Sequence, residues 1–166
     1  MATGWQADKR WSDRFLPEIK SILGVHLIGE PPVEEDAERN TDLMVLKLDA
    51  VRIGCRVRKH KFLSRYSDEF TMRCGRPSGT KTELTKVIEG WGDYFLYGFC
   101  DAGERSLSAW MLGDLKVFRL WYCRSLRKMA AGQSPGSVKR NIDGSSDFTA
   151  FKIFNLPAEF LIGRKT

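Results

Sequence analysis

The sequence predicts a mixed α/β domain in which one helix precedes three strands, a second helix and a further strand. Apolar residues recur at helical spacing over 12–23, and they alternate with polar residues over 41–59. A nearly continuous apolar and aromatic run follows at 93–100, as expected of a strand that is covered on both sides. The chain has 166 residues, 42% of them hydrophobic, which is enough to bury a core without disulfides or metal. We therefore expect a single domain over 1–166.

The first predicted helix spans 12–23 and carries one apolar stripe, formed by Phe15, Ile19, Ile22 and Leu23. Two placements of this helix are open. If Ser12 caps it, Pro17 lies beyond the first turn and should kink it; otherwise the regular part begins near Leu16. In both placements Glu18 lies beside the apolar stripe. The segment 29–40 is rich in proline and acidic residues and predicts a loop.

Two β-patterned runs at 42–48 and 51–58, joined by a tight connection, predict a hairpin. In the second run the apolar residues have one parity and the basic residues the other. Because side chains alternate between the two faces of a strand, one face can pack into a core while the other holds Arg56 and Arg58 in a row. Asp42 opens the first run and is the candidate neighbour of that row. An acid beside a row of arginines indicates phosphate chemistry.

The later elements follow from periodicity and capping residues. Trp91 belongs to the inward stripe of the second helix, and the aromatic residues in general follow buried periodicities, so we assign them to the core. The core is expected over about 12–131, with an extension at 132–166. The elements predicted are a basic loop or short helix at 59–68, a strand at 69–74, a helix from a Thr80–Glu83 capping box to Gly90 or Gly92, strands at 93–100 and 106–112, a helix at 115–131 capped by Asp114, a long loop at 132–147 and a strand at 148–154.

Composition and charge narrow the class of protein. The 27 basic and 21 acidic residues give a net charge of +6, which favours a polyanionic partner such as nucleic acid. The four cysteines form no CxxC pair, so we interpret them as reduced and mostly buried thiols. No apolar run has the length of a membrane helix, and the N-terminus has no signal-peptide core. A cytoplasmic protein without a membrane partner is expected.

The order of the elements and the position of the charges resemble the PD-(D/E)XK nuclease superfamily, with its restriction-endonuclease-like fold. Asn40-Thr41-Asp42 stands where the family has Pro-Asp, and Arg56-Val57-Arg58 where it has an acid-x-Lys pair. Glu18 matches an additional metal-binding glutamate on the first helix of many members. The resemblance covers about 12–100. It implies an α-β-β-β-α-β core, to which this chain adds a C-terminal helix and strand.

The resemblance also implies that Asp42 and Glu18 bind Mg²⁺, which activates water against a phosphodiester, while Arg58 and Arg56 steady the scissile phosphate. The chain departs from the family at Arg56, because an arginine at a ligand position repels magnesium. Arg58 stays protonated and cannot transfer a proton at neutral pH. Either a second carboxylate comes from elsewhere, or the fold has lost catalysis and kept phosphate binding. The candidates for that carboxylate are Glu18, Glu69, Glu83 and Asp49.

The leading hypothesis is therefore a DNA-engaging protein with a magnesium-dependent phosphodiesterase activity. The alternative is a catalytically inactive relative that binds nucleic acid or a protein partner, as accessory or inhibitory proteins of phages and mobile elements do. A third hypothesis is an ordinary α+β domain with a basic surface. Five basic residues either extend a track for a nucleic-acid backbone or belong to the charged end of a helix and a loose loop: Arg124, Arg127, Lys128, Lys139 and Arg140. The residues predicted to contact nucleic acid are Arg52, Arg56, Arg58, Lys59, Lys61 and Lys81.

Overall fold

The structure is a computed structural model that describes residues 4–29, 44–45 and 51–166. Its elements are α-helices, strands and short 3-10 helices, the last labelled η. In chain order they are α1 Gly4–Asp13, α2 Leu16–Leu27, β1 Ile28–Gly29, β2 Met44–Val45, β3 Ile53–Arg58, η1 His60–Phe62, α4 Leu63–Tyr66, β4 Glu69–Gly75, α5 Glu83–Ile88, β5 Tyr94–Cys100, β6 Leu107–Asp114, α6 Leu115–Arg127, β7 Ser137–Arg140, β8 Asp147–Lys152, η2 Ile153–Asn155, η3 Ala158–Phe160 and β9 Leu161–Lys165.

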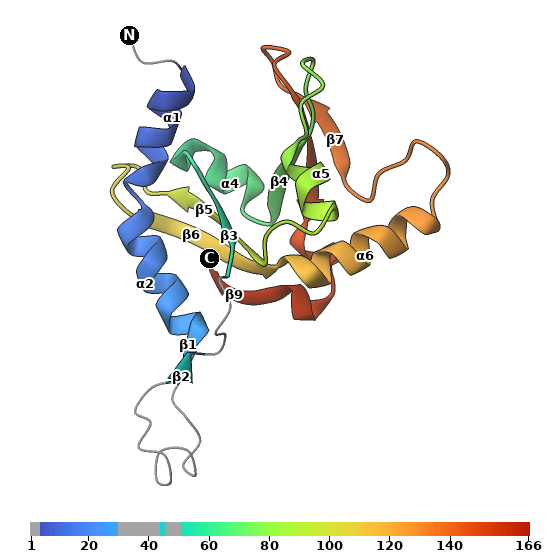
Figure 1. Cartoon of the computed structure of the whole chain (residues 1–166). Helices are drawn as coiled ribbons and strands as arrows, with labels where there is room; N and C mark the ends of the chain where they lie inside the picture. Colours follow the sequence, from blue (N-terminus) through green and yellow to red (C-terminus); the bar gives the residue numbers. More distant parts are fainter. Residues whose placement is uncertain (1–3, 30–43, 46–50) are drawn as a thin grey trace, which may run out of the picture.

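Two sheets form the body of the protein (Figure 1). The first is mixed: its strand order is β3-β5-β6-β9, with β3 parallel to β5 and the other pairs antiparallel. The second has the order β4-β8-β7 and is antiparallel throughout. The chain between β3 and β5 supplies both β4 and α5, so the two sheets are interleaved in sequence. The fold is a mixed α+β arrangement, which agrees with the predicted class at this level.

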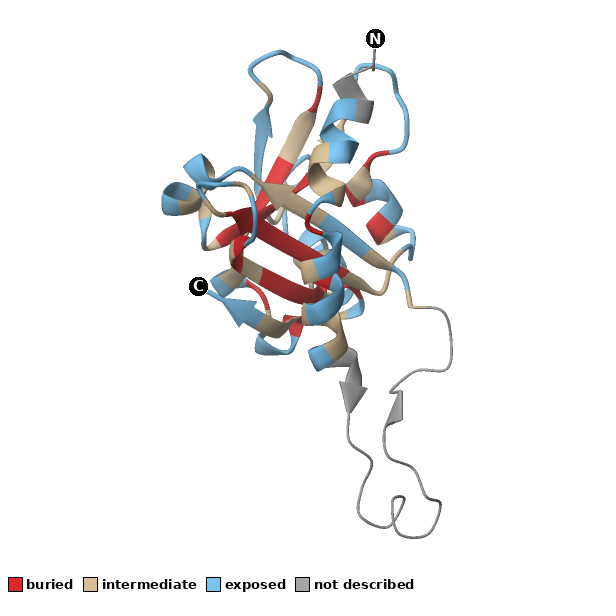
Figure 2. Cartoon of the chain, turned by 90° about the vertical axis from the view of Figure 1, so that its left-hand side faces the viewer, coloured by how far each residue is buried: buried red, intermediate tan, exposed pale blue. Residues whose placement is uncertain are grey.

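The four-stranded sheet has a hydrophobic core on each face, and its strands β5 and β6 are the most buried (Figure 2). On one face, Phe15 and Ile19 of the N-terminal region pack against Leu96, Leu107 and Leu112. The other face packs against α5, α6 and the three-stranded sheet. The largest fully buried side chains there are Phe70, Met72, Tyr97, Leu115, Phe118, Phe151 and Phe160.

The predicted first helix is two helices, and Phe15 lies at the break between them. The second of the two open placements is therefore confirmed, since α2 begins at Leu16 and Pro17 occupies its first turn, where its missing N–H costs no hydrogen bond. The preceding helix α1 was not predicted. Its Trp11 packs edge-on against Phe15, with ring centroids 5.3 Å apart, and its indole N–H donates to Glu104 at 2.6 Å.

The N-cap of the helix α5 lies two residues later than predicted. Thr82 is the N-cap, and its hydroxyl accepts from the Thr85 backbone N–H at 3.3 Å, so the predicted capping box from Thr80 is wrong. Trp91 is also not part of the core, because its side chain is 63% exposed. It follows the helix end, where Gly90 and Gly92 both have positive φ and turn the chain outward.

The C-terminal region holds more strand than the sequence predicted. The segment predicted as a loop contains β7, which pairs with the predicted strand β8, and the tail forms β9, which pairs with β6. Conversely, α6 ends at Arg127, four residues before the predicted end. Asp114 caps α6 as predicted, since its carboxylate accepts from the backbone N–H groups of Lys116 and Val117.

Three further predictions concern the strand pair and the general character of the chain. The predicted hairpin of the runs at 42–48 and 51–58 is wrong for the described residues, because β2 pairs with β1 in a separate two-stranded sheet while β3 pairs in parallel with β5. Asp42 and the predicted connection of the hairpin lie outside the described residues. The prediction of mostly buried thiols is wrong, because only Cys100 is buried while Cys55 and Cys123 are exposed. None of the helices in the described residues has the length and apolar character needed to cross a membrane.

Candidate functional site

The two arginines of β3 face the three-stranded sheet, as their parity predicts. Arg56 and Arg58 lie beside Tyr97 and Phe99 in the parallel register, and those aromatic residues belong to the core on that face. Val57, between the two arginines, packs with the opposite core instead. The strand therefore places both guanidinium groups in the region between the two sheets.

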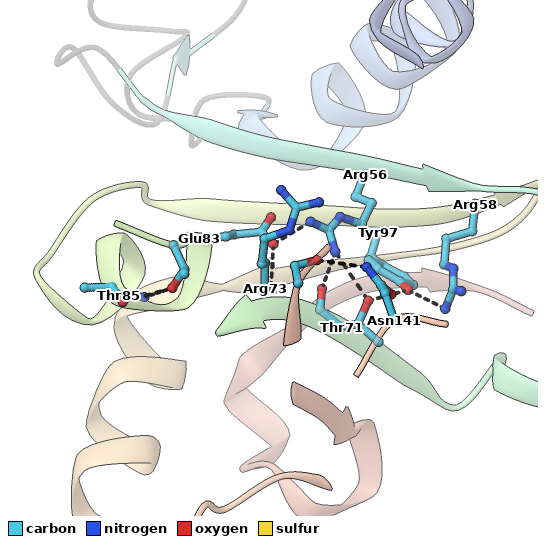
Figure 3. A network of polar contacts seen from close by, with 10 residues as sticks. Arg56, Arg58, Thr71, Arg73, Glu83, Thr85, Tyr97 and Asn141 are labelled. Carbon is cyan, nitrogen blue, oxygen red and sulfur yellow. Dashed lines mark hydrogen bonds and ion pairs between the residues drawn. The ribbon is translucent and has the colours of Figure 1, made fainter. Parts of the chain in front are cut away.

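Arg56 is held by Glu83, the first residue of α5 (Figure 3). Its Nη2 donates to Glu83 Oε2 at 2.6 Å, and its Nη1 donates to the Thr71 carbonyl oxygen at 3.1 Å. The same carboxylate oxygen accepts from the Arg73 backbone N–H at 3.1 Å. Both side chains of the ion pair are 29% exposed. Glu83 is thus the counter-ion of Arg56, a role more specific than a helix cap.

The surroundings of Glu83 carry more positive than negative charge. Burial, and then the charges of Arg76 and Arg56, lower the pKa of Arg73, while Glu83 acts in the opposite direction. Arg73 therefore interacts electrostatically with two other guanidinium groups and one carboxylate. We call Arg56, Arg73 and Arg76, with Glu83, the arginine cluster. Its excess of positive charge favours an anionic ligand.

A chain of hydrogen bonds joins the arginine cluster to Arg58 (Figure 3). The Thr71 hydroxyl, 3.4 Å from Arg56 Nη1, lies 3.1 Å from the Tyr97 hydroxyl, which also accepts from Arg58 Nη1 at 3.4 Å. The Arg58 guanidinium carbon is 4.3 Å from the centroid of the Phe62 ring. This is a cation–π distance, and a contact of this kind contributes about 0.5–2 kcal/mol depending on desolvation. Arg58 is therefore fixed both by hydrogen bonding and by stacking.

Arg58 and its aromatic partners form one wall of a groove of about 650 Å³. Phe62 and Tyr66 belong to that wall, and the connection between β7 and β8 supplies the facing wall. We call this hollow the stacking groove. It is lined by Arg58, Phe62, Tyr66, Glu69, Lys139, Arg140, Asn141, Ile142, Asp143 and Phe148.

A second hollow of about 410 Å³ adjoins the stacking groove and shares Tyr66, Glu69 and Lys139 with it. Together the two hollows are lined by five basic and two acidic side chains. Some of these charges are internally balanced, since Arg140 pairs with Asp147, and Lys152 pairs with Asp68 and Glu69. Among the described residues, the basic side chains of these hollows without a carboxylate partner are Arg58, Arg65 and Lys139.

The three unpartnered cations surround one ring. Tyr66 has the Arg65 guanidinium carbon 5.4 Å from its centroid, the Arg58 carbon at 5.6 Å and the Lys139 ammonium at 5.9 Å. Lys61 similarly lies 5.2 Å from the centroid of Phe62. The stacking groove thus concentrates positive charge on aromatic surfaces, an arrangement suited to binding phosphates next to planar groups.

The predicted magnesium ligands are not brought together by the described residues. Glu18 Oε2 accepts from the Leu107 backbone N–H at 2.8 Å, where α2 covers the face of the sheet opposite to Arg56. Asp42 and Asp49 lie outside the described residues, and Glu69 pairs with Lys152. Within the described ranges there is no group of three His, Cys, Asp or Glu side chains placed to hold a metal ion. This donor set does not fit Mg²⁺, which prefers several carboxylate and water oxygens.

The other residues predicted to contact nucleic acid have varied surroundings. Arg52 is exposed, and Lys59 Nζ lies 3.7 Å from Glu104 Oε1. Lys81 pairs with Glu89 at 2.8 Å, so its charge is balanced locally. Tyr66 and Ile142 were not predicted as site residues, because each enters the groove through packing between distant segments. Lys139 and Arg140 were among the five basic residues proposed as an extension of the track, and both line the groove.

The candidate site therefore consists of the arginine cluster and the stacking groove, which are joined by hydrogen bonds through the buried side chains of Thr71 and Tyr97. Guanidinium groups bind phosphate oxygens with two parallel hydrogen bonds, and aromatic rings bind planar groups by their faces. Both kinds of group are present here, the guanidinium groups on β3 and the Phe62 ring in η1. Comparison with known proteins gives no match to a family model, to a curated protein or to a solved structure.

Proposed function

We propose that this protein binds nucleic acid, with the arginine cluster and the stacking groove as its interface. The observation that carries the proposal is the placement of Arg58, Arg65 and Lys139, which have no carboxylate partner among the described residues and lie around the Tyr66 ring in a groove. A cation without an acidic partner is available to a phosphate. Arg58 is half-buried against the Phe62 ring, whereas Arg65 and Lys139 are exposed beside the Tyr66 ring.

The charge balance of the whole chain supports the same proposal. The net charge of +6 attracts polyanions, and each phosphate that a basic side chain neutralises releases condensed counter-ions. Binding should therefore weaken steeply as salt is added. A plot of the logarithm of affinity against the logarithm of salt concentration should have a slope of about −0.7 to −0.9 per neutralised phosphate. Three such contacts would be visible as a slope of about −2 to −3.

We further propose that the chain is a degenerate relative of the PD-(D/E)XK nucleases that has kept phosphate binding without cleavage. Two observations support this. Along the chain β3, β4, α5 and β5 follow one another in the order of the family core, although β4 belongs to the other sheet, and Arg56 is paired with Glu83 at the position where the family has a metal-binding acid. An arginine so paired offers a phosphate a donor but offers a cation no ligand.

Fluorescence anisotropy with labelled DNA and RNA oligonucleotides over a salt series tests binding. The variant Lys139→Ala is expected to lose several-fold in affinity and about one phosphate from the salt slope. Lys81→Ala is the matched control, because Lys81 is an equally exposed lysine whose charge is already balanced by Glu89. Equal losses in the two variants, or a salt-independent affinity, would refute the proposed interface.

A further inference from the structure

The two walls of the stacking groove differ in chemistry. One wall consists of Arg58 over Phe62 with Tyr66 beside it, and it is planar and cationic. The rest of the lining includes two apolar side chains, Ile142 of the connection between β7 and β8 and Phe148 of β8. Ile142 lines the groove, and its side chain is fully exposed to solvent. A slot with one planar cationic wall and one apolar wall matches a flat ring with two faces.

The turn that carries Ile142 is closed by several hydrogen bonds. The Asn141 backbone N–H donates to the Ser146 carbonyl oxygen, and the Gly144 N–H donates to the Asn141 carbonyl oxygen, both at 2.9 Å. The Asn141 side-chain amide also donates to the Ser146 hydroxyl at 2.8 Å. Gly144 has a φ of +67°, a conformation that glycine adopts without strain. These hydrogen bonds close the turn and leave the Ile142 side chain fully exposed to solvent.

The size of the groove limits what can enter it. Its volume of about 650 Å³ is within the range of about 300–1,000 Å³ that small organic ligands occupy. A nucleotide unit is a ligand of this size, whereas a base inside a duplex reaches such a slot only after unstacking and unpairing, at a cost of a few kcal/mol. Two cations lie beside this slot, with Arg65 5.4 Å and Lys139 5.9 Å from the centroid of the Tyr66 ring.

From these observations we infer that the stacking groove takes unstacked bases of a single-stranded nucleic acid, with one base face against Arg58 and Phe62 and the other against Ile142. This inference rests on the proposed function, because it names the form of nucleic acid that the same site binds. Stacking on a ring face is possible for every base, so the expected preference is for strandedness and not for sequence. Phosphates of the same strand would contact Lys139 and Arg65.

Anisotropy titrations with three DNA probes of one length and label test the inference: an oligo(dT), an abasic strand with the same phosphates, and a duplex. A matching oligo(U) distinguishes RNA from DNA as the source of the single strand. The expected order is a tighter complex with the thymine strand than with the abasic strand or the duplex, by about tenfold. The abasic strand isolates the bases, because it keeps the backbone charge.

Two exposed apolar residues of the same hairpin supply a matched pair of variants. Ile142→Ser is expected to reduce oligo(dT) affinity several-fold and leave abasic affinity unchanged. Val138→Ser should change neither, since Val138 is 58% exposed but does not line the stacking groove. Circular dichroism and thermal melting check that both variants fold.

The outcomes separate the two proposals. If the thymine strand, the abasic strand and the duplex bind equally well and Ile142→Ser changes nothing, the groove contacts only phosphates and the inference is overturned, while the proposed function stands. If the wild-type protein binds none of the probes at low salt, both fail. A loss confined to intact single strands in Ile142→Ser supports base insertion.

Discussion

Replacing Glu83 with glutamine is expected to destabilise the fold and to strengthen nucleic-acid binding. Glutamine has nearly the same shape as glutamate and keeps one side-chain oxygen. It removes the carboxylate of the arginine cluster, which is paired with Arg56. Glu83 Oε2 accepts two hydrogen bonds, from Arg56 at 2.6 Å and from the Arg73 backbone N–H at 3.1 Å. The substitution should therefore lower the stability of the fold and, by removing a negative charge, raise the affinity for nucleic acid.

The magnitude follows from the exposure of the pair. Hydrogen bonds to charged groups contribute about 1.5–3 kcal/mol each, and exposed ion pairs contribute about 0–1 kcal/mol. With both side chains 29% exposed, screening is partial, and we expect a loss of roughly 1–2 kcal/mol. For a domain of this size, 1 kcal/mol corresponds to about 2–4 °C in Tm. The expected fall is therefore about 2–8 °C.

Binding should change in the other direction. Without the Glu83 charge, the arginine cluster no longer contains a carboxylate that repels phosphate, and Arg56 is free to bind one more phosphate. The salt slope should then steepen by about 0.7–0.9, and affinity at low salt should increase. Differential scanning fluorimetry and anisotropy titrations at several salt concentrations measure the two effects on the same sample.

Glu89→Gln is the matched control, because Glu89 pairs with the exposed Lys81 outside the arginine cluster. Its Tm and its salt slope should both stay close to those of the wild type. The reasoning fails if Glu83→Gln melts at the wild-type temperature, since the ion pair then contributes nothing. It also fails if Glu83→Gln binds more weakly, which would mean that Glu83 orients Arg56 for the ligand and does not compete with it.

Three further predictions follow from other parts of the structure. Gly113→Ala should lower stability by about 1–3 kcal/mol in thermal denaturation, because a methyl group at Gly113 would overlap the Phe160 ring in the core; an unchanged Tm would contradict this packing. The hydrogen bond from Trp11, and then the nearby positive charges, hold the pKa of Glu104 below its ordinary value of 4.5. The ionised Glu104 therefore stabilises the fold above that pH, and its contribution is lost as the pH falls through the lowered pKa. Between about pH 6 and pH 3, the Tm of Glu104→Gln should therefore fall less than that of the wild type, and parallel curves would exclude the linkage. In a plasmid assay with Mg²⁺ or Mn²⁺, the wild-type protein and Asp42→Ala should cleave equally, and EDTA should not change the result for either protein. A metal-dependent activity that is lost only in Asp42→Ala would restore the nuclease hypothesis.

The sequence predicted well the elements whose signals are local. The strand at 69–74, the aromatic strand at 93–100 and the Asp114 cap were confirmed, because alternation, apolar runs and capping residues act within a few residues of one another. The parity of Arg56 and Arg58 was also confirmed, since it needs only the two-residue period of a strand.

What the sequence could not predict depends on contacts between distant segments. Ile142 faces Arg58 only because β7 pairs with β8 and β8 pairs with β4, and the exposed strand β7 has no alternating apolar pattern of its own. Glu83 has the spacing of a capping-box residue relative to Thr80, yet its carboxylate is engaged by Arg56 of a different sheet. The long-range ion pair outweighs the local motif there, and the hydroxyls of Thr82 and Thr85 meet at the helix start instead.

The interleaving of the two sheets also bears on how this chain folds. The strand β4 is made before the parallel pair β3–β5 can form, but its own partner β8 begins only at Asp147, more than seventy residues later. Neither sheet can be completed from one continuous half of the chain. We therefore expect a single cooperative unfolding transition, slow folding set by these long loops, and no stable fragment that ends before β8. A split between residues 101 and 106 should yield two pieces that regain structure only when mixed.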